Sequence, residues 1–239
     1  MELNSEAGVA EALRAAELEV VGRMRYSSNA TFLVDVRADG LEMHAIYKPR
    51  RGERPLWDFP EGTLCHREVA AYELSDALGW GIVPVTIMRD GPLGEGAVQQ
   101  FVAHDPDEHY FTLLDGREDR FRQFAVFDVL TNNTDRKGGH CLRDDLRDTV
   151  VGIDHGLTFH PAWKLRTVIW DFAGETVAES LRDDVCRAMD SLRDGALRDR
   201  LRPHLTDVEL EAVEYRGRAV LAEGLPYPDD YRSTPWPLV

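Results

Sequence analysis

The stretch VLTNNTDRKGGHCL, residues 129–142, decides how this chain is interpreted. An apolar segment ends in it, and Asp135, a basic pair, two glycines and His140 follow within a few positions. Two interpretations compete. The stretch is either an ordinary helix exit, which glycine favours, or a loop that presents a carboxylate for chemistry. The sequence on either side distinguishes them.

Composition narrows the class of protein. The 239 residues are 43% hydrophobic and 30% charged, which describes a soluble globular protein of one large domain or two small ones. The net charge of −15 opposes binding to nucleic acid or to anionic lipid, since both need a basic surface. The N-terminus lacks the features of a signal peptide, and three cysteines without paired spacing indicate a reducing compartment. We therefore expect a cytoplasmic protein with no nucleic-acid partner and no stable membrane association.

Lysine is scarce in this chain. Of the 28 Lys and Arg residues, only Lys48, Lys137 and Lys164 are lysine. Because the chain uses arginine at all its other basic positions, a lysine is a stronger indication of a functional role here than usual.

The first part of the chain reads as a β-rich lobe with one central helix. Alternating apolar positions and turn signals, including the Asp-Gly pair at 39–40, predict strands, and helical spacing predicts helices. The expected strands are 18–24, 31–36, 41–49, 82–88 and 97–102, and the expected helices are 6–18 and 64–78.

The second part reads as mostly helical. The segment 104–132 is expected to be helical and to carry an apolar face at Phe121, Phe124, Ala125 and Val129. A short strand pair around 141–143 and 149–153 follows, and helices dominate from about 177. We expect an α+β, bilobal domain with an N-terminal lobe over 1–102 and a C-terminal lobe over 103–239.

The groups that phosphoryl transfer requires occur in a workable order. The reaction needs a cation on the phosphates, a divalent metal on hard ligands, and a carboxylate that positions the acceptor hydroxyl. Lys48 ends a strand in AIYKP, Asp135 follows a helix in NNTDR, and Asp154 closes an apolar strand in VVGIDHG. This order favours the second interpretation of the opening stretch.

Other side chains support this chemistry less specifically. A carboxylate on the helix 64–78 could hold Lys48, but Glu68 and Glu73 flank its apolar stripe equally, so periodicity does not choose between them. The turn YSSNATF, residues 26–32, has small residues whose N–H groups can approach phosphate oxygens. His140, between the two aspartates, is a candidate metal ligand or hydrogen-bond partner.

Six motifs together resemble the phosphatidylinositol 3-/4-kinase-like superfamily, most closely the type II phosphatidylinositol 4-kinases. HipA-type bacterial kinases and secretory-pathway casein kinases are more distantly similar. The motifs span roughly residues 20 to 175 in the family's order: SSNATFLV, AIYKP, REVAAYELSDALGWGIVP, AVQQFV, DVLTNNTDRKGGHCL and GIDHGLTF. The resemblance implies a protein-kinase-like fold and ATP-dependent phosphoryl transfer with Mg²⁺ or Mn²⁺.

The resemblance also implies a role for each matching position. Lys48 would contact the α- and β-phosphates, and Glu68, placed by its distance to Ile82-Val83-Pro84, would be its partner. Asp135 would be the catalytic aspartate of the pair that it forms with Arg136, with Lys48 and Arg136 as the other expected catalytic residues, and Asp154 would be the principal metal ligand. The remaining cofactor positions are Ser27, Ser28 and Asn29 for the phosphates, and Gln100, Phe101 and Val102 for the adenine.

Two positions depart from the family pattern. His140 stands where the second metal ligand is usually asparagine, and Mg²⁺ prefers oxygen to imidazole. His155 is a variation in the metal motif. The chain also lacks a cysteine-rich stretch for palmitoylation, so we expect a small-molecule or protein hydroxyl as acceptor and not a membrane lipid.

Three alternatives remain open. A pseudokinase would bind nucleotide or a partner without transfer, which the histidine at position 140 motivates. A kinase fold could instead transfer AMP. A zinc site built from His140, His155 and His160 is the poorest alternative, because the spacing lacks a usual zinc pattern.

Overall fold

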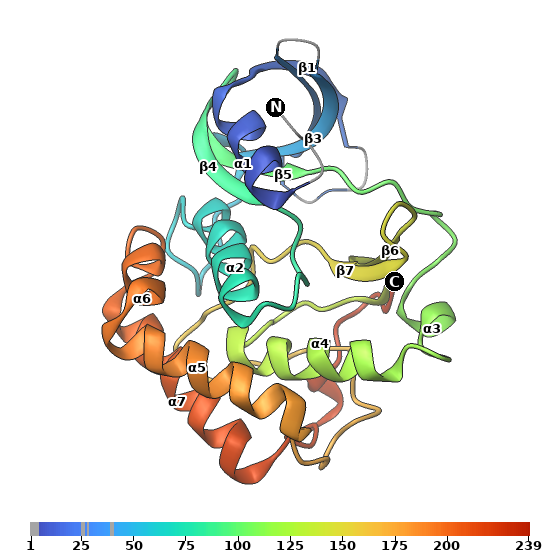
Figure 1. Ribbon diagram of the computed structural model, residues 1–239, viewed down its shortest axis with the longest axis vertical. Helices are drawn as coiled ribbons and strands as arrows, with labels where there is room; N and C mark the ends of the chain where they lie inside the picture. Colours follow the sequence, from blue (N-terminus) through green and yellow to red (C-terminus); the bar gives the residue numbers. More distant parts are fainter. Residues whose placement is uncertain (1–4, 25–26, 28, 39–40) are drawn as a thin grey trace.

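A five-stranded antiparallel sheet forms the N-terminal lobe and helices form most of the C-terminal lobe, as predicted (Figure 1). This computed structural model describes residues 5–24, 27, 29–38 and 41–239. The predicted Asp-Gly turn at 39–40 and the predicted phosphate-loop residue Ser28 lie outside the described residues. The sheet has the order β1-β2-β3-β5-β4, with β1 (Glu17–Arg23), β2 (Phe32–Ala38), β3 (Leu41–Pro49), β4 (Thr86–Gly91) and β5 (Gly94–Gln100).

The two faces of this sheet have different roles. Directly paired residues share a face, and the pair Tyr47 and Val98 is fully buried in the main core. The next pair, Ile46 and Gln99, belongs to the opposite face, as does Lys48. That opposite face is turned to the C-terminal lobe and forms one wall of a cavity between the lobes.

Helix α2 (Leu64–Leu78) has the bounds that the sequence predicted. The carboxylate of Glu53 accepts hydrogen bonds from the N–H groups of Leu64 and Cys65, at 3.1 and 2.8 Å, and so caps the first turn. Gly79 ends the helix in the left-handed conformation, at φ 73°. Helix α1 (Glu6–Ala15) packs on strands β2, β4 and β5.

The strand expected over 82–88 begins later, at Thr86. The N–H groups of Ile82 and Val83 donate to the Ser75 hydroxyl of α2, at 2.8 and 3.1 Å, and Ile82 accepts from Gly152 in the other lobe. The segment is apolar, but the hydrogen bonds of Ile82 and Val83 go to a helix and to the C-terminal lobe, and only the Val85 carbonyl bonds to the sheet, accepting from the Gln100 N–H at 2.8 Å. Ile82 and Val83 therefore join the lobes and do not lengthen the sheet.

The expected helical stretch 104–132 is also broken. Its first residues are not helical, and α3 (Tyr110–Leu113) and α4 (Glu118–Thr131) are separated by a turn in which Gly116 has φ 78°. The apolar face predicted for the second of these helices is buried. Strands β6 (Cys141–Asp144) and β7 (Thr149–Gly152) form the expected hairpin. The remaining elements are α5 (Glu179–Asp194), α6 (Ala196–Leu201), α7 (Asp207–Glu223) and the 3-10 turns η1 (Arg50–Gly52), η2 (Gly138–His140) and η3 (Tyr231–Ser233).

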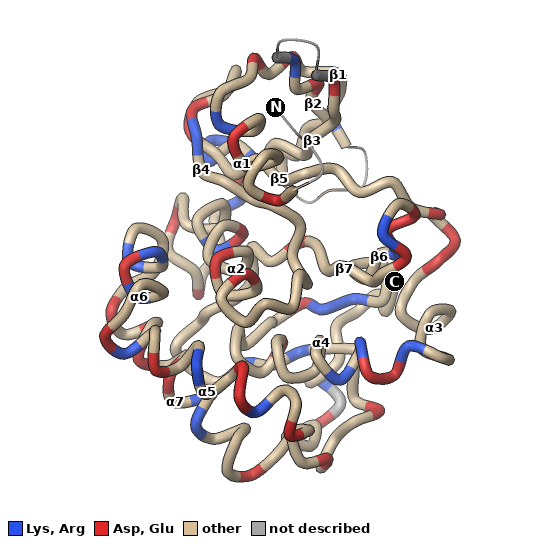
Figure 2. The backbone as a smooth tube through the Cα atoms, in the orientation of Figure 1, with Lys and Arg blue, Asp and Glu red and all other residues tan. Residues whose placement is uncertain are grey.

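The C-terminal helices hold α2 against the lower lobe. Arg67 of α2 is buried, donates to the Thr158 carbonyl at 2.7 Å and forms an ion pair with Glu209 of α7. Figure 2 shows acidic and basic positions mixed over α5, α6 and α7, and Arg200 of α6 pairs with Glu73 and Asp76 of α2. The lobes are thus joined by charged contacts as well as by one continuous core.

The last residues of the chain return to the middle of the molecule. The Leu238 carbonyl accepts from the Gly138 N–H at 2.6 Å, and Figure 1 shows the C-terminus beside β6 and β7. Within the described ranges, no helix is both long and apolar enough to cross a membrane. The lobe boundary expected between residues 102 and 103 stays a prediction.

Candidate active site

Two adjoining cavities lie between the lobes. The larger, of about 270 Å³, has mainly apolar walls from the sheet and from β6–β7, among them Ile46, Leu142 and Ile153. The smaller, of about 60 Å³, is polar and includes Asn29, Glu68 and Asp135. Both cavities are lined by Ser27, Thr31, Lys48 and Asp154. An apolar slot beside a charged one suits a molecule with a flat ring and an anionic tail.

Lys48 lies at the junction of the cavities. Its Nζ donates to Glu68 of α2 and to Asp154 Oδ1, the latter at 2.9 Å. The other oxygen of Glu68 accepts the backbone N–H of His155 at 3.0 Å. Glu68 therefore connects the strand lysine with the backbone of the loop that carries Asp154. Glu73, the other candidate, faces Arg200 instead.

The local charges act strongly on one another. Burial alone would lower the pKa of Lys48, but Asp154 and Glu68 together raise it, so the lysine stays charged. Lys48 lowers the pKa of Asp154 far below its ordinary value. Burial raises the pKa of Glu68, and the charge of Lys48 opposes this effect. The arrangement keeps a cation and a carboxylate adjacent at the cavity junction.

Asp154 is held in a demanding backbone conformation. Its φ is 60°, in the left-handed region that non-glycine residues adopt infrequently. The residue follows β7 immediately after Ile153, and its side chain is half exposed. Such conformations persist where the surrounding structure enforces them, often at functional sites.

Asp135 lines the smaller cavity from the opposite lobe. Its backbone N–H donates to Asn133 Oδ1 at 3.0 Å, and its Oδ2 lies 3.4 Å from Lys137 Nζ. Burial raises the pKa of Asp135, and Lys137 acts against this shift. Among the described residues its other oxygen, Oδ1, has no bonded partner, and a partly buried carboxylate of this kind can accept a proton from a hydroxyl.

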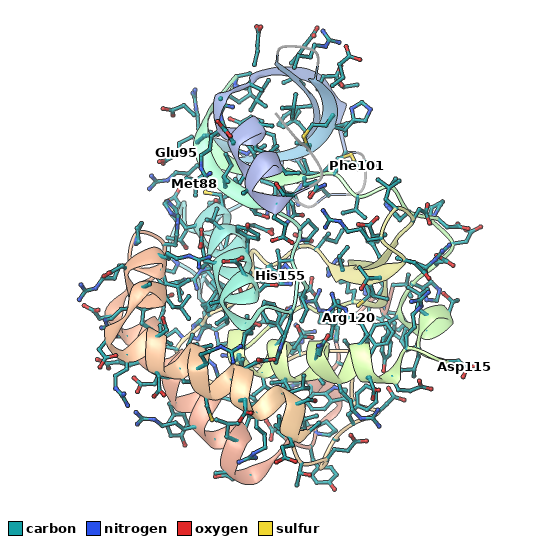
Figure 3. All side chains as sticks on the ribbon, in the orientation of Figure 1. Met88, Glu95, Phe101, Asp115, Arg120 and His155 are labelled. Carbon is teal, nitrogen blue, oxygen red and sulfur yellow. The ribbon has the colours of Figure 1, made fainter. Side chains whose placement is uncertain are left out.

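Arg136 was predicted among the catalytic residues, but its side chain is fully excluded from solvent. It pairs with Asp128 of α4, and its Nη2 lies 2.7 Å from His155 Nε2. Figure 3 shows His155 in the middle of the molecule, between α2 and β7. Arg136 therefore holds the loops around the cavity and does not face it.

His140 lies beside Asp154 at the rim of the larger cavity. Its Nε2 is 3.6 Å from Asp154 Oδ2, and burial lowers the pKa of His140 to about 4, so the imidazole is neutral. Two ligands of one octahedral ion with bonds of about 2.1 Å lie roughly 3.0 Å apart at right angles. The pair Asp154 and His140 fits a divalent ion after a small adjustment, with its other positions left for phosphate or water.

The predicted nucleotide contacts gather around the same space. Ser27 Oγ is 2.8 Å from Thr31 Oγ1, and Asn29 Oδ1 accepts the Arg54 N–H at 2.9 Å. The turn is less open than predicted, because the Ala30 N–H donates to Gly52. Gln100, Phe101 and Val102 line the larger cavity, and Figure 3 shows Phe101 where the chain leaves the sheet. The N–H of Val102 has no partner in the part of the chain that the structure describes.

The three histidines of the zinc alternative are not brought together. His155 Nε2 faces Arg136, and the ring of His160 packs on Phe59. Across the described ranges, no three His, Cys, Asp or Glu side chains form a group that could hold a metal. A metal here would therefore need ligands from a bound molecule or solvent.

Comparison with known proteins places the chain in a family. It is 39% identical to protein Rv2133c of Mycobacterium tuberculosis over an alignment of 261 residues, which covers 94% of this chain and 93% of that protein. The chain belongs to the family of this mycobacterial protein. No protein-family model matches the chain.

Solved structures identify the fold. The Golgi casein kinase, in a crystal structure with Mn and ADP bound, matches with a TM-score of 0.58 at 14% identity, over 92% of this chain and 75% of that one. The Helicobacter pylori proinflammatory kinase CtkA matches with a TM-score of 0.51 at 11% identity, over 88% of this chain and 94% of that one. At these identities the likeness establishes the fold alone, which is protein-kinase-like.

Several residues of the site escaped the sequence analysis. Asp128 lies inside a helix that reads as apolar, Glu53 in a loop that reads as polar, and Gln99 in a strand. No pattern in the sequence indicated the hydrogen bond between the Leu238 carbonyl and the Gly138 N–H, in the loop that follows Asp135. A charged residue on a buried helix face, as at Asp128, was the one available clue, because such residues are rarely buried without a partner.

Proposed function

We propose that this protein is an ATP-dependent kinase that transfers a phosphoryl group to a hydroxyl of a small molecule or a protein. The observation that carries the proposal is the position of Lys48, between Glu68 and Asp154 and between an apolar and a polar cavity. The protein-kinase-like fold supports it. We also propose the finer affiliation with the phosphatidylinositol 3-/4-kinase-like superfamily and the lobe division at residues 102 and 103, both from the sequence motifs.

The larger cavity is the proposed adenine site. Its apolar walls, Ile46, Leu142 and Ile153, can enclose a base, and the free N–H of Val102 can donate to a ring nitrogen. The triphosphate would then run past Lys48 into the smaller cavity. Ser27 and Asn29 line that path from the N-terminal lobe. Ser28, outside the described residues, belongs to the same proposal by the sequence motif.

Lys48 and Asp135 have separate proposed tasks. Lys48, kept charged by its two carboxylates, neutralises the α- and β-phosphates and fixes their position. Asp135 accepts the proton of the acceptor hydroxyl while the oxygen of that hydroxyl bonds to the γ-phosphorus. At the same time, the bond between the γ-phosphorus and the β–γ bridging oxygen breaks. The products are the phosphorylated acceptor and ADP. Arg136 contributes by positioning Asp135 and not by touching the reacting atoms.

Asp154 and His140 are the proposed holders of Mg²⁺ or Mn²⁺. A divalent ion, when bound, neutralises the charge that develops on the phosphate oxygens. Asp154 supplies a carboxylate whose pKa keeps it ionised, and His140 supplies a neutral imidazole. A neutral imidazole is the form of histidine that can ligate a metal.

A screen of metabolites and protein extracts with γ-labelled ATP, run with Mg²⁺ and with Mn²⁺, tests the proposal. We expect label in an acceptor with the wild-type chain and a loss of about 10²- to 10⁴-fold in Asp135→Asn, with nucleotide affinity little changed. Single-turnover transfer that persists in Asp135→Asn would overturn the role of Asp135. Nucleotide binding without turnover in either metal would favour a pseudokinase, and an AMP increment by intact-mass spectrometry would favour AMPylation.

A further inference from the structure

Gln99 stands at the inner wall of the larger cavity. It is the last but one residue of β5, pairs with Ile46 on one side and with Thr86 on the other, and is 4% exposed. Because directly paired residues share a face, Gln99 lies on the face that lines this cavity. A buried carboxamide on a mainly apolar cavity wall calls for an explanation, since buried polar groups need partners.

The hydrogen bonds around Gln99 fix which end of its carboxamide is free. The Thr86 hydroxyl donates its single proton to the Pro84 carbonyl at 2.7 Å. Toward Gln99 this hydroxyl can therefore only accept, and Nε2 of Gln99 donates to it at 2.8 Å. The orientation of the amide follows from this chain of bonds, and Oε1 is the end that remains. Among the residues that the structure describes, no donor is bonded to Gln99 Oε1.

We propose that Gln99 selects the base of the nucleotide, a proposal that rests on the function proposed above. Its Oε1 accepts a hydrogen bond from an exocyclic amino group, as at position 6 of adenine. Hypoxanthine and guanine carry a carbonyl oxygen at position 6 instead of an amino group. This oxygen would face Gln99 Oε1, and because both atoms are acceptors, neither would have a hydrogen-bond donor. Thr86 is the positioning residue, because it prevents the carboxamide from rotating to present its NH₂ group instead.

Equilibrium binding of ATP and of inosine triphosphate to the full chain, measured by calorimetry with Mg²⁺, tests this selection. The two probes differ at position 6 and in the protonation of the adjacent ring nitrogen. We expect the wild-type chain to bind ATP roughly 10- to 100-fold more tightly. In Gln99→Leu the preference should fall by about tenfold, since a buried hydrogen bond of this kind accounts for a factor of that size. The Val102 N–H acts equally in all variants, so the change in preference isolates Gln99.

Two substitutions of Thr86 test whether its hydroxyl acts by fixing the orientation of the Gln99 carboxamide. Thr86→Ser keeps the hydroxyl and should keep the preference for ATP. Thr86→Val removes the hydroxyl while Gln99 remains, frees the amide to rotate, and should reduce the preference by improving binding of inosine triphosphate. This pair also decides the matter if Gln99→Leu does not fold.

The outcomes are distinguishable from a failure of the proposed function. Wild-type protein that binds both triphosphates alike, or a preference unchanged in Gln99→Leu and in Thr86→Val, would overturn base selection and leave the kinase proposal standing. Wild-type protein that binds neither triphosphate would overturn the kinase proposal and base selection with it.

Discussion

The carboxylate of Asp128 accepts hydrogen bonds from Nε and Nη2 of Arg136, at 3.0 to 3.1 Å, with both side chains fully excluded from solvent. The same carboxylate accepts from Asn133 Nδ2 and from Thr167 Oγ1, each at 3.1 Å. One residue of α4 thereby connects the loop that carries Asp135 with the segment that contains Thr167. The loop that carries Asp135 is therefore held by the helix that precedes it.

Asp128→Asn should destabilise the fold strongly. The substitution leaves the buried Arg136 without its counter-charge, and breaking a buried ion pair typically costs about 3–5 kcal/mol of the free energy of unfolding. Denaturant unfolding measures this loss. Asp190→Asn is the control, because Asp190 forms an exposed pair with Arg193 that is expected to contribute less than about 1 kcal/mol. Equal losses in the two variants would contradict the structural role of Asp128.

The sequence predicted those parts of the site that local pattern determines. The helix 64–78 has apolar residues at helical spacing and a terminal glycine, Lys48 lies near the end of β3, and Asp154 follows β7 by two residues, so their positions follow from the elements. The sequence placed Arg136 beside Asp135 but gave no indication that its side chain is buried. Its burial depends on Asp128, eight residues earlier, whose orientation no local pattern reveals.

Contacts between distant segments could not be predicted in this way. Glu68 and Glu73 flank the same apolar stripe, and what separates them is that Arg200, far along the chain, pairs with Glu73. The segment 82–85 has the composition of a strand, yet the Ser75 hydroxyl accepts the N–H groups of Ile82 and Val83. In both cases local propensity favours neither alternative, and contacts with residues distant in the sequence determine which one forms.

Glu68→Gln and Glu73→Gln form a matched pair that tests the lysine partner. Gln at 68 keeps the shape but removes the charge that holds Lys48, so we expect transfer to fall roughly 10- to 100-fold, consistent with the loss of a charged hydrogen bond. Gln at 73 should leave transfer unchanged and weaken only the contact with Arg200. Turnover of γ-labelled ATP checks both variants. A larger loss at 73 than at 68 would refute the assignment.

The contact between His66 and His204 should make stability depend on pH. Their Nδ1 atoms lie 3.1 Å apart where α2 meets the turn after α6, and burial lowers the pKa of His204 to about 4 and also lowers that of His66. The unfolded chain binds protons here below about pH 6.5, and the folded chain does not. The free energy of unfolding should therefore fall as the pH drops from about 6.5 toward 4. In His204→Gln this fall should be about 1 kcal/mol smaller by denaturant unfolding at pH 7 and pH 5. Parallel pH profiles of the two proteins would contradict it.

His140→Asn should shift the metal preference toward Mg²⁺. Nε2 of His140 lies 3.6 Å from Asp154 Oδ2, so asparagine there would offer a second oxygen to the ion that Asp154 holds. Mg²⁺ prefers oxygen ligands, and imidazole lowers its affinity relative to Mn²⁺. Ligation by Nε2 also requires the proton on Nδ1, which the Lys137 N–H approaches at 3.5 Å, so His140 is a weaker ligand than a well-oriented histidine.

The measurement for His140→Asn is the ratio of ATP turnover with Mg²⁺ to turnover with Mn²⁺. We expect this ratio to rise by about tenfold over the wild-type value, the lower end of the effects that metal-site substitutions produce. His160→Asn is the control, because His160 packs on Phe59 away from Asp154 and should leave the ratio unchanged. A ratio that is the same in the wild type and in His140→Asn would exclude His140 from the metal site. Asp154 would then hold the ion with phosphate and solvent as its other ligands, and His140 would serve only to line the base cavity.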